Sequence, residues 1–226
     1  MNPLGSKRHF HERLDDLQAR LLEMAGEAED LLGRAVEALV ARSRSGLEEV
    51  RDGDAVVDAL ELDVDERALE LLALQQPMAR DLRQIIASLK IANDLERVGD
   101  HAVKIAWSGL RLLEIPAHSA PPQIEEMAVL SRGMLADALR AFITRDTELA
   151  REIRVRDDRV DALRSAAHRI LVSHMLEDPR RITAALELFL VAQSLERVAD
   201  LATNVAEETV FLVEGLVIRH LPEVSS

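Results

Sequence analysis

Two copies of one twelve-residue stretch, placed 100 positions apart, constrain this chain more than any other feature. The first copy reads LERVGDHAVKIA at residues 95–106, and the second reads LERVADLATNVA at residues 195–206. Each copy holds a glutamate and, four positions later, an aspartate. Residues at this spacing lie on one face of an α-helix, one turn apart. The repeat therefore predicts a helical unit that the chain uses twice.

The glutamate of each copy stands on the line of residues that its helix is expected to bury. Steps of four and three residues from each glutamate trace a mostly apolar seam, as expected for contact with neighbouring helices. The two seams are Ile85, Leu89, Ala92, Glu96, Gly99, Val103, Ala106, Leu110 and Leu113, and Ala185, Phe189, Ala192, Glu196, Ala199, Thr203, Ala206, Val210 and Val213. The small residue after each glutamate, Gly99 or Ala199, predicts a close approach of another helix. Because a buried carboxylate costs free energy unless positive charge meets it, Glu96 and Glu196 indicate a cation nearby.

The composition favours helices and limits the classes of partner. The chain has 226 residues, of which 48% are hydrophobic, with one Trp, four Phe and no Tyr or Cys. Few aromatic residues and plentiful Leu, Ala, Glu and Arg favour helix over sheet. A net charge of −13 argues against nucleic acid as the main partner, because such proteins present a basic face to phosphates. The absence of cysteine excludes disulfides and zinc–thiolate sites.

The termini and the hydropathy pattern predict a cytoplasmic protein. Residues 1–14 are polar and charged and contain no apolar signal-peptide core. No stretch approaches the 18 or so apolar residues that a membrane-spanning helix needs. We therefore expect no membrane span, although peripheral association with a membrane stays open.

Apolar periodicity predicts an all-α fold of six long helices. We expect these helices at about residues 7–43, 47–75, 77–114, 124–143, 146–176 and 180–215, with loose tails at 1–6 and 216–226. Pro77 and the Asp178-Pro179 pair separate the second helix of each half from the third, and the proline-rich segment 116–122 links the halves. The predicted architecture is two tandem three-helix bundles, residues 1–116 and 117–226, related by an internal repeat.

A second acidic pair falls on the predicted middle helix of each half. These pairs are Asp54 with Asp58 and, 103 positions later, Asp157 with Asp161. If they face the pairs of the repeated stretch, four carboxylates converge in each half, and a cation would relieve their repulsion. The candidate metal ligands are Asp54, Asp58, Glu96 and Asp100 in the first half, and Asp157, Asp161, Glu196 and Asp200 in the second. Oxygen ligands suit magnesium, calcium, manganese or ferric iron, and are less typical of zinc.

Plainer interpretations of the same residues stay open. Asp54 and Asp58 lie in an acid-rich run, which ordinarily marks a solvated helix face. Glu96 and Glu196 could instead form buried ion pairs with arginines such as Arg97 and Arg197. His101, beside the first acidic pair, is either a ligand or second-shell partner, or a half-exposed helix histidine.

The quoted motifs resemble those of the PhoU family of phosphate-transport accessory proteins. Residues 95–106 resemble the family signature, and residues 203–208, TNVAEE, match the end of its second copy. Residues 8–14, RHFHERL, and 76–83, QPMARDLR, look like the family's start and the entry to its third helix. The second signature departs from the pattern, since Ala replaces Gly and Leu replaces His.

The resemblance implies two tandem three-helix bundles and a regulator rather than an enzyme. It implies negative regulation of phosphate uptake and of the phosphate-starvation response, as an adaptor between an ABC phosphate transporter and a sensor histidine kinase. It further implies a homodimer, and metal binding through the acidic motifs with iron, zinc or another ion.

Two rival functions are weighed beside this one. A carboxylate-bundle metal enzyme or metal store would use the same acids, but the Glu-x-x-His element of di-iron bundles is missing. No phosphate-binding glycine loop or nucleophile with its base is present either. A purely structural helical protein would leave the acids without a ligand.

Overall fold

The structure, a computed structural model, describes residues 3–74, 79–115 and 120–217, and every regular element among them is a helix. The elements are α1 (Pro3–Val40), α2 (Arg44–Arg51), α3 (Ala55–Leu74), α4 (Ala79–Leu113), α5 (Pro122–Thr144), α6 (Thr147–Glu177), the 3-10 helix η1 (Pro179–Arg181) and α7 (Ile182–Glu214). The predicted all-α class is confirmed. The expected break at Pro77 and the expected boundary at 116–117 lie outside the described residues.

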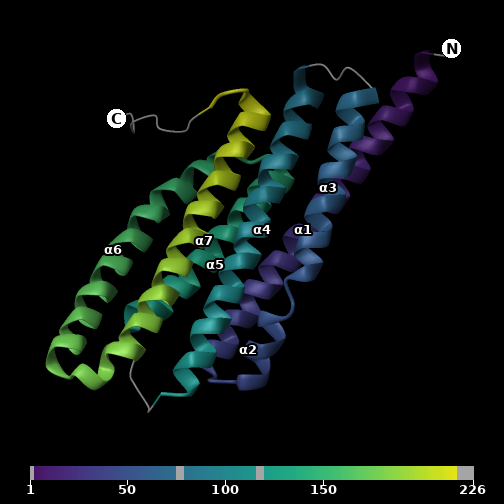
Figure 1. The fold of residues 1–226 in the computed structure, drawn as a ribbon. Coiled ribbons are helices and arrows are strands. Elements are labelled where there is room, and N and C mark those ends of the chain that lie inside the picture. The colour runs from purple at the N-terminus through teal and green to yellow at the C-terminus, as the bar shows by residue number, and fades with distance from the viewer. Residues whose placement is uncertain (1–2, 75–78, 116–119, 218–226) are drawn as a thin grey trace, which may run out of the picture.

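The two helices that carry the repeated stretch lie side by side along the middle of the molecule (Figure 1). α4 packs against α1, α2 and α3, whereas α7 packs against α5 and α6. α4 and α7 also pack against each other in opposite directions, because contacts join Lys90 to Glu208 near one end and Arg111 to Glu187 near the other. The two copies of the motif therefore face a common joint between the halves.

The buried side chains form one connected core that includes residues of both halves. The predicted seams supply much of it: Ile85, Ala92 and Ala106 of α4 are fully buried, as are Ala192 and Ala206 of α7. Burial of these stripes explains why the helices form and stay packed, since amphipathic faces rather than propensity stabilise most helices in proteins.

The prediction of one helix over residues 47–75 is wrong, because the chain breaks between α2 and α3. Residues 52–54, Asp-Gly-Asp, lie outside both helices, and the Gly53 amide donates to the Val50 carbonyl over 3.1 Å. Glycine is the poorest helix former after proline, and aspartate competes for backbone hydrogen bonds. The described part therefore contains the six long helices that were predicted and, in addition, the short helix α2 of eight residues.

The ends of the first predicted helix also differ from expectation. α1 begins at Pro3, within the predicted tail, and ends at Val40, before Arg42 with its φ of +52°. Ser43 then caps α2, its hydroxyl accepting from the Gly46 amide over 3.3 Å. A serine at this position satisfies a free amide of the first turn, so the Ser-Arg-Ser-Gly cluster starts a helix as well as following one. At the end of the last helix, Gly215 has a φ of +73° and ends α7.

A search of the described residues finds no helix that is both long and apolar enough to cross a membrane.

Candidate functional site

The structure brings the acidic pair of α4 close to the acids of α3 in the first half. The pKa of Glu96 is raised, first by burial and then by the carboxylates of Asp100, Glu61, Asp58 and Asp54. Repulsion of this kind indicates that each of the four carboxylates lies within about 10 Å of Glu96. We call these five residues the first carboxylate set. Asp54, Asp58 and Asp100 thus act electrostatically on Glu96, and so does Glu61, which was not among the predicted ligands.

The other members of the first carboxylate set feel the same repulsion. Burial and then the charges of Asp58 and Asp100 raise the pKa of Asp54. Burial and then Asp65 raise the pKa of Glu61, while a hydrogen bond from Asn93 acts in the opposite direction. Such a group of anions favours any cation that can reach it.

Within the described residues of the first half, the one ion pair of the first carboxylate set is between Lys104 and Asp100. Lys104 donates to Asp100 over 2.9 Å, one turn along α4, and both side chains are about half exposed. In the described part of the chain, no ion pair involves Glu96. The carboxylate on the seam therefore lacks a counter-ion of its own.

In the second half, arginine side chains supply the positive charge beside the motif glutamate. Glu196 is buried, and Arg164 of α6 donates to it over 2.7 Å, with the Arg197 guanidinium 3.6 Å away. Arg164 also lies 3.4 Å from Asp161, and Arg197 donates to Asp200 over 2.8 Å. The ion pair with arginine, left open as an alternative for Glu196, is what the structure contains.

Asp157, the last of the four predicted acids of the second half, forms no ion pair with an arginine among the described residues. Burial, followed by the charges of Asp200, Asp161, Glu196 and Asp158, raises the pKa of Asp157 to about 6. We call Asp157, Asp161, Glu196 and Asp200 the second carboxylate set. All four predicted residues are thus brought together, but two guanidinium groups already lie among them.

Glu61 and Arg164 occupy equivalent positions in the two halves. The offset of 103 residues that relates Asp54 to Asp157 and Asp58 to Asp161 also relates Glu61 to Arg164. At this position the first half adds a negative charge beside Glu96, whereas the second half adds a positive charge that binds Glu196. The halves therefore share a fold and a motif but have opposite charge at the position facing the motif glutamate.

The arrangement of donors determines how well each set suits a metal ion. No group of three or more His, Asp or Glu side chains within the described ranges stands close enough together to hold an ion as the side chains lie. The first set nevertheless fits a hard cation in chemistry, being all oxygen, mutually repelling and without a cation at Glu96. The second set does not suit a metal ion, because Arg164 and Arg197 already supply positive charge to its carboxylates.

The sequence predicted that Asp54 and Asp58 form a pair on one helix, but Asp54 lies outside the helix. Asp54 precedes α3, and its backbone carbonyl accepts from the amides of Val57 and Asp58 over 2.9 and 3.2 Å. The Asp-Gly-Asp break causes this difference. Asp58 lies in the first turn of α3, where the helix dipole favours a carboxylate.

The expected need for a small residue at Gly99 is not supported. A Cβ atom built on Gly99 would lie 3.5 Å from the nearest side-chain atom, on Val57, which is an ordinary van der Waals contact. Ala199, its counterpart on α7, is fully buried without difficulty. The change from glycine to alanine in the second copy therefore does not alter helix approach.

His101 is a half-buried helix histidine held in its neutral form. Burial first, and then the positive charge of Lys104, lower its pKa to about 4, against the opposing effect of Asp100. Its Nδ1 atom is buried and has no hydrogen-bond partner within the described part of the chain. The imidazole lines a groove between α4 and α7 and does not complete the first carboxylate set.

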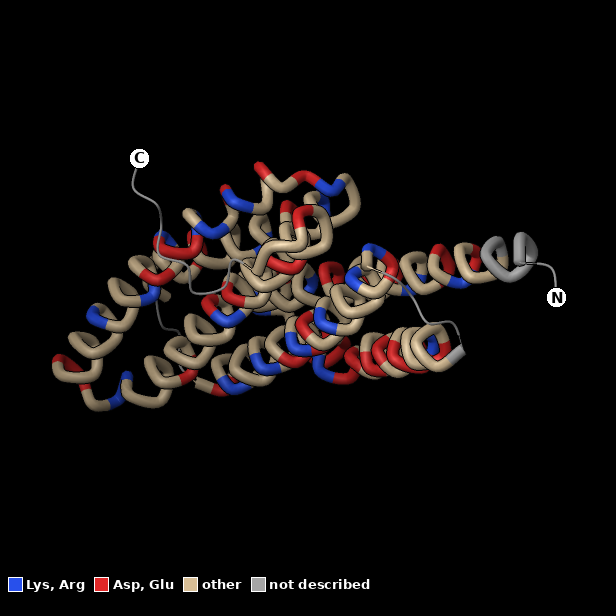
Figure 2. The backbone as a smooth tube through the Cα atoms, turned by 90° about the horizontal axis from the view of Figure 1, so that it is seen from above, with Lys and Arg blue, Asp and Glu red and all other residues tan. Residues whose placement is uncertain are grey.

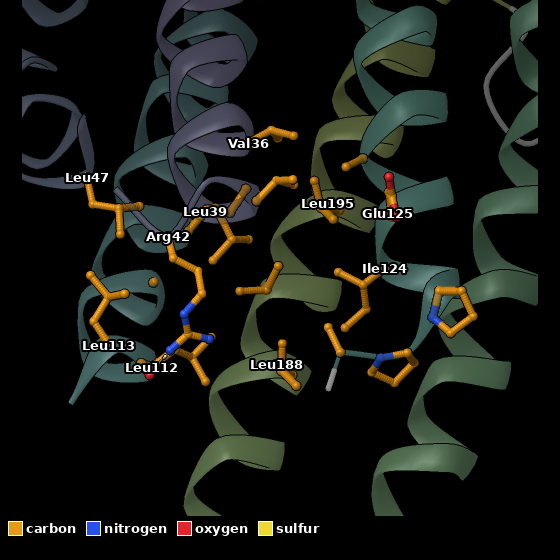
Figure 3. Close-up of a pocket in the computed structure, with 18 residues that line it drawn as sticks. Val36, Leu39, Arg42, Leu47, Leu112, Leu113, Ile124, Glu125, Leu188 and Leu195 are labelled. Atoms are coloured by element: carbon orange, nitrogen blue, oxygen red, sulfur yellow. Dashed lines mark hydrogen bonds between the residues drawn. The ribbon is translucent and has the colours of Figure 1, made fainter. Parts of the chain in front are cut away.

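An apolar cavity of about 270 Å³ lies where α1, α4, α5 and α7 meet (Figure 3). Its wall is mainly aliphatic, including Leu39, Leu113, Ile124 and Leu188. Arg42 reaches along it, but its guanidinium donates to the Leu112 carbonyl over 3.2 Å. A ligand site needs several polar groups that converge on a ligand, so this cavity belongs to the joint between the halves.

Comparisons with known proteins agree with the duplicated motif. A sequence model described as "PhoU domain" matches twice, at residues 21–108 and 124–209. A protein of Pseudomonas aeruginosa named phosphate-specific transport system accessory protein PhoU homolog is 37% identical, over 95% of this chain and 89% of its own. One of the same name from Aquifex aeolicus is 38% identical, over 92% of this chain and 95% of its own.

Two solved structures have the same fold as this chain. The crystal structure of PhoU from Pseudomonas aeruginosa has a TM-score of 0.88 and 36% identity, covering 92% of this chain and all of that one. The phosphate transport system regulatory protein PhoU from Streptococcus pneumoniae has a TM-score of 0.85 and 28% identity, covering 92% of this chain and 98% of that one. The chain therefore belongs to the PhoU family, whose members are regulatory accessory proteins rather than enzymes.

Proposed function

We propose that this protein is an accessory regulator of phosphate-specific transport, which represses phosphate uptake and the phosphate-starvation response when phosphate is plentiful. One observation carries the proposal: the PhoU domain matches both halves, and relatives named for phosphate-specific transport align over about nine-tenths of both chains. We further propose that it acts in the cytoplasm as a homodimer, associated peripherally with an ABC phosphate transporter.

Regulation of this kind requires docking rather than catalysis. Long helices with charged outer faces provide surfaces for other proteins, and electrostatic complementarity sets partner choice. We propose that the protein links the transporter to a sensor histidine kinase in this way. Such a link is a switch only if one conformation of a partner binds the protein more tightly than another does.

The first carboxylate set is proposed to take up a hard cation, with Asp54, Asp58, Glu96 and Asp100 as predicted ligands and Glu61 beside them. Magnesium, manganese, calcium and ferric iron fit the oxygen donors best, and zinc fits them less well. A bound cation would supply positive charge between α3 and α4. The raised pKa of Glu96 and its lack of an ion pair support this proposal. For Asp157, Asp161, Glu196 and Asp200 we propose no resident metal, because arginines neutralise that set.

The rival function, a metal-dependent enzyme or metal store, is not favoured by any particular observation. An iron store or di-iron enzyme needs several carboxylates or histidines that converge on the ion. The described residues contain no such group of three.

A deletion strain of the source organism tests the proposed role. Loss of the gene should raise phosphatase and transporter expression at high phosphate, and the wild-type gene should restore repression. A deletion strain with normal repression at high phosphate would contradict the proposal.

A binding assay tests the adaptor role separately. The purified protein is immobilised, and the transporter's ATPase subunit and the cytoplasmic part of the kinase are passed over it. Binding to both supports an adaptor. Binding to neither, at high or low phosphate, would count against that role while leaving the family assignment in place.

A further inference from the structure

A groove of about 850 Å³ runs between α4 and α7 on the outside of the molecule. Its walls are built from one face of each helix. Arg97, Asp100, His101, Lys104, Trp107, Ser108 and Arg111 of α4 line one wall, and Leu190, Gln193, Ser194 and Arg197 of α7 line the other. We call this surface the α4–α7 groove. The two helices are those that lie side by side in Figure 1.

Most of the charged side chains that line the α4–α7 groove are cationic. Four of its lining side chains are cationic and one is acidic, although the net charge of the chain is −13. Along most of the other helices acidic and basic residues are interspersed (Figure 2), whereas residues 54–70 are rich in acids. A groove lined by cationic side chains attracts an anionic partner.

The cations of α4 are spaced regularly along the groove. Arg97, Lys104 and Arg111 follow one another at intervals of seven residues, which is two helical turns, or about 10.5 Å. Lys104 forms an ion pair with Asp100, Arg111 with Glu187, and Arg197 with Asp200 and Glu196, but no ion pair involves Arg97 in the described part of the chain. Acidic side chains on a second helix can match this spacing, because they recur at the same interval on one of its faces.

Exposed apolar side chains lie among these cations. Trp107 is 46% exposed and Leu190, on the other wall, is 43% exposed. Leu186 and Ile182 continue the same face of α7 in steps of four residues and are also exposed. The Arg51 guanidinium lies 5.4 Å from the centre of the Trp107 ring. Partly exposed tryptophan and arginine side chains are typical of surfaces that bind another protein.

We propose that the α4–α7 groove docks an acidic amphipathic helix of a partner protein. The proposal rests on the accessory role proposed above and names the surface that would perform it. Acids two turns apart on the partner would meet Arg97, Lys104 and Arg111, and apolar residues between them would cover Trp107 and Leu190. A concave surface between two helices fits a third helix, whereas a membrane surface would meet only its rims.

The single tryptophan of the chain gives a direct reading of the groove. Because Trp107 is the only one, covering it with a tryptophan-free peptide changes the whole tryptophan emission of the protein. The probe is an 18-residue helical peptide with glutamate at every seventh position and leucines between. Its control is the same peptide with lysine in place of glutamate. The acidic peptide should shift the Trp107 emission to the blue and bind more weakly as salt rises.

A pair of matched variants locates the binding. Arg97→Glu reverses a charge in the groove, whereas Arg169→Glu reverses an exposed arginine on α6, outside it. The affinity for the acidic peptide should fall at least tenfold in Arg97→Glu and stay within twofold in Arg169→Glu. Circular dichroism shows whether both variants keep the helical fold. The absence of a blue shift, an equal response to the lysine peptide, or equal effects of the two variants would overturn the proposal.

Other occupants have their own outcomes. A blue shift with phosphatidylglycerol vesicles but not with the acidic peptide would overturn the proposal in favour of a lipid surface. A blue shift that grows with protein concentration alone and disappears in Arg97→Glu would overturn it in favour of a second copy of the chain.

The transporter ATPase subunit and the kinase are tested on the same variants. Binding of either that Arg97→Glu leaves unchanged overturns the groove but keeps the regulator role. Failure of both to bind the wild type contradicts the adaptor role instead.

Discussion

Arg164 donates a hydrogen bond to Glu196 over 2.7 Å and so supplies, within the second half, the positive charge that the first half lacks at Glu96. The equivalent residue of the first half, Glu61, has the opposite charge. This difference in charge at equivalent positions can be tested from both sides.

Removal of the arginine should destabilise the second half. Arg164→Ala leaves the buried Glu196 without its closest partner, which should cost about 1–3 kcal/mol of unfolding free energy near neutral pH. The loss should shrink at pH 4, because a protonated Glu196 needs no counter-ion. Urea unfolding at both pH values measures it. Arg159→Ala, which breaks an ion pair of α6 with the exposed Glu126, should change stability by less than about 0.5 kcal/mol.

An arginine at position 61 should take the place of the cation proposed for the first carboxylate set. Glu61→Arg places a guanidinium beside Glu96, so the variant should be more stable than wild type in chelator. Added Mn²⁺ should raise the melting temperature of wild type, since a ligand of the folded state alone stabilises it, and should have a smaller effect on Glu61→Arg. Thermal unfolding with and without Mn²⁺, and elemental analysis, measure both. Equal manganese effects on the two proteins would contradict the prediction, and Glu61→Gln separates loss of a ligand from gain of a cation.

The partly buried Asp157 of the second half should make stability depend on pH. Folding raises the pKa of Asp157 from 3.8 to about 6, mainly through burial, so the folded state holds this proton more tightly than the unfolded state does. The cost is absent below pH 3.8, grows as pH rises to about 6, and is complete above that pH. Asp157→Asn should therefore stabilise the protein above pH 7 by about 1–2 kcal/mol, after allowance for solvent screening of a half-exposed group. A gain that is the same at pH 4 and pH 8 would refute this explanation.

Two glycines of α4 should respond differently to alanine. At Gly99 a Cβ has room, so Gly99→Ala should stabilise the protein by up to about 1 kcal/mol through helix propensity. At Gly109 the Cβ would lie 2.8 Å from a Leu47 methyl group. Since Leu47 is fully buried, Gly109→Ala should destabilise by about 1–3 kcal/mol. Urea unfolding of the two variants side by side tests the pair, and similar changes in both would show that the packing differs from this description.

Periodicity along the chain was enough to predict the helical fold, because each helix buries one continuous stripe. It was also enough to place Glu96 and Glu196 on the buried faces of α4 and α7. The break at residues 52–54 was missed because heptad positions continue through it, while the Asp-Gly-Asp sequence ends the helix locally.

The partners of the motif glutamates could not be predicted in the same way. Spacing tells which residues share a face of one helix, but not which residue of a neighbouring helix faces them. Glu61 was one acid in an acid-rich run, and Arg164 one arginine among many. A comparison of the two halves at the fixed offset of 103 residues would have shown that Glu61 and Arg164 are equivalent positions of opposite charge. The α4–α7 groove depends on two helices at once, so neither stretch alone indicates it.

Asp100 belongs both to the first carboxylate set and to the wall of the α4–α7 groove, where it holds the ammonium group of Lys104. A metal that drew this carboxylate toward α3 would release Lys104 for an acidic helix in the groove. By thermodynamic reciprocity, a helix that engaged Lys104 would leave Asp100 freer to bind the metal. Two events on opposite sides of one helical turn would thus strengthen each other, and the regulator would sense its ion and its partner jointly.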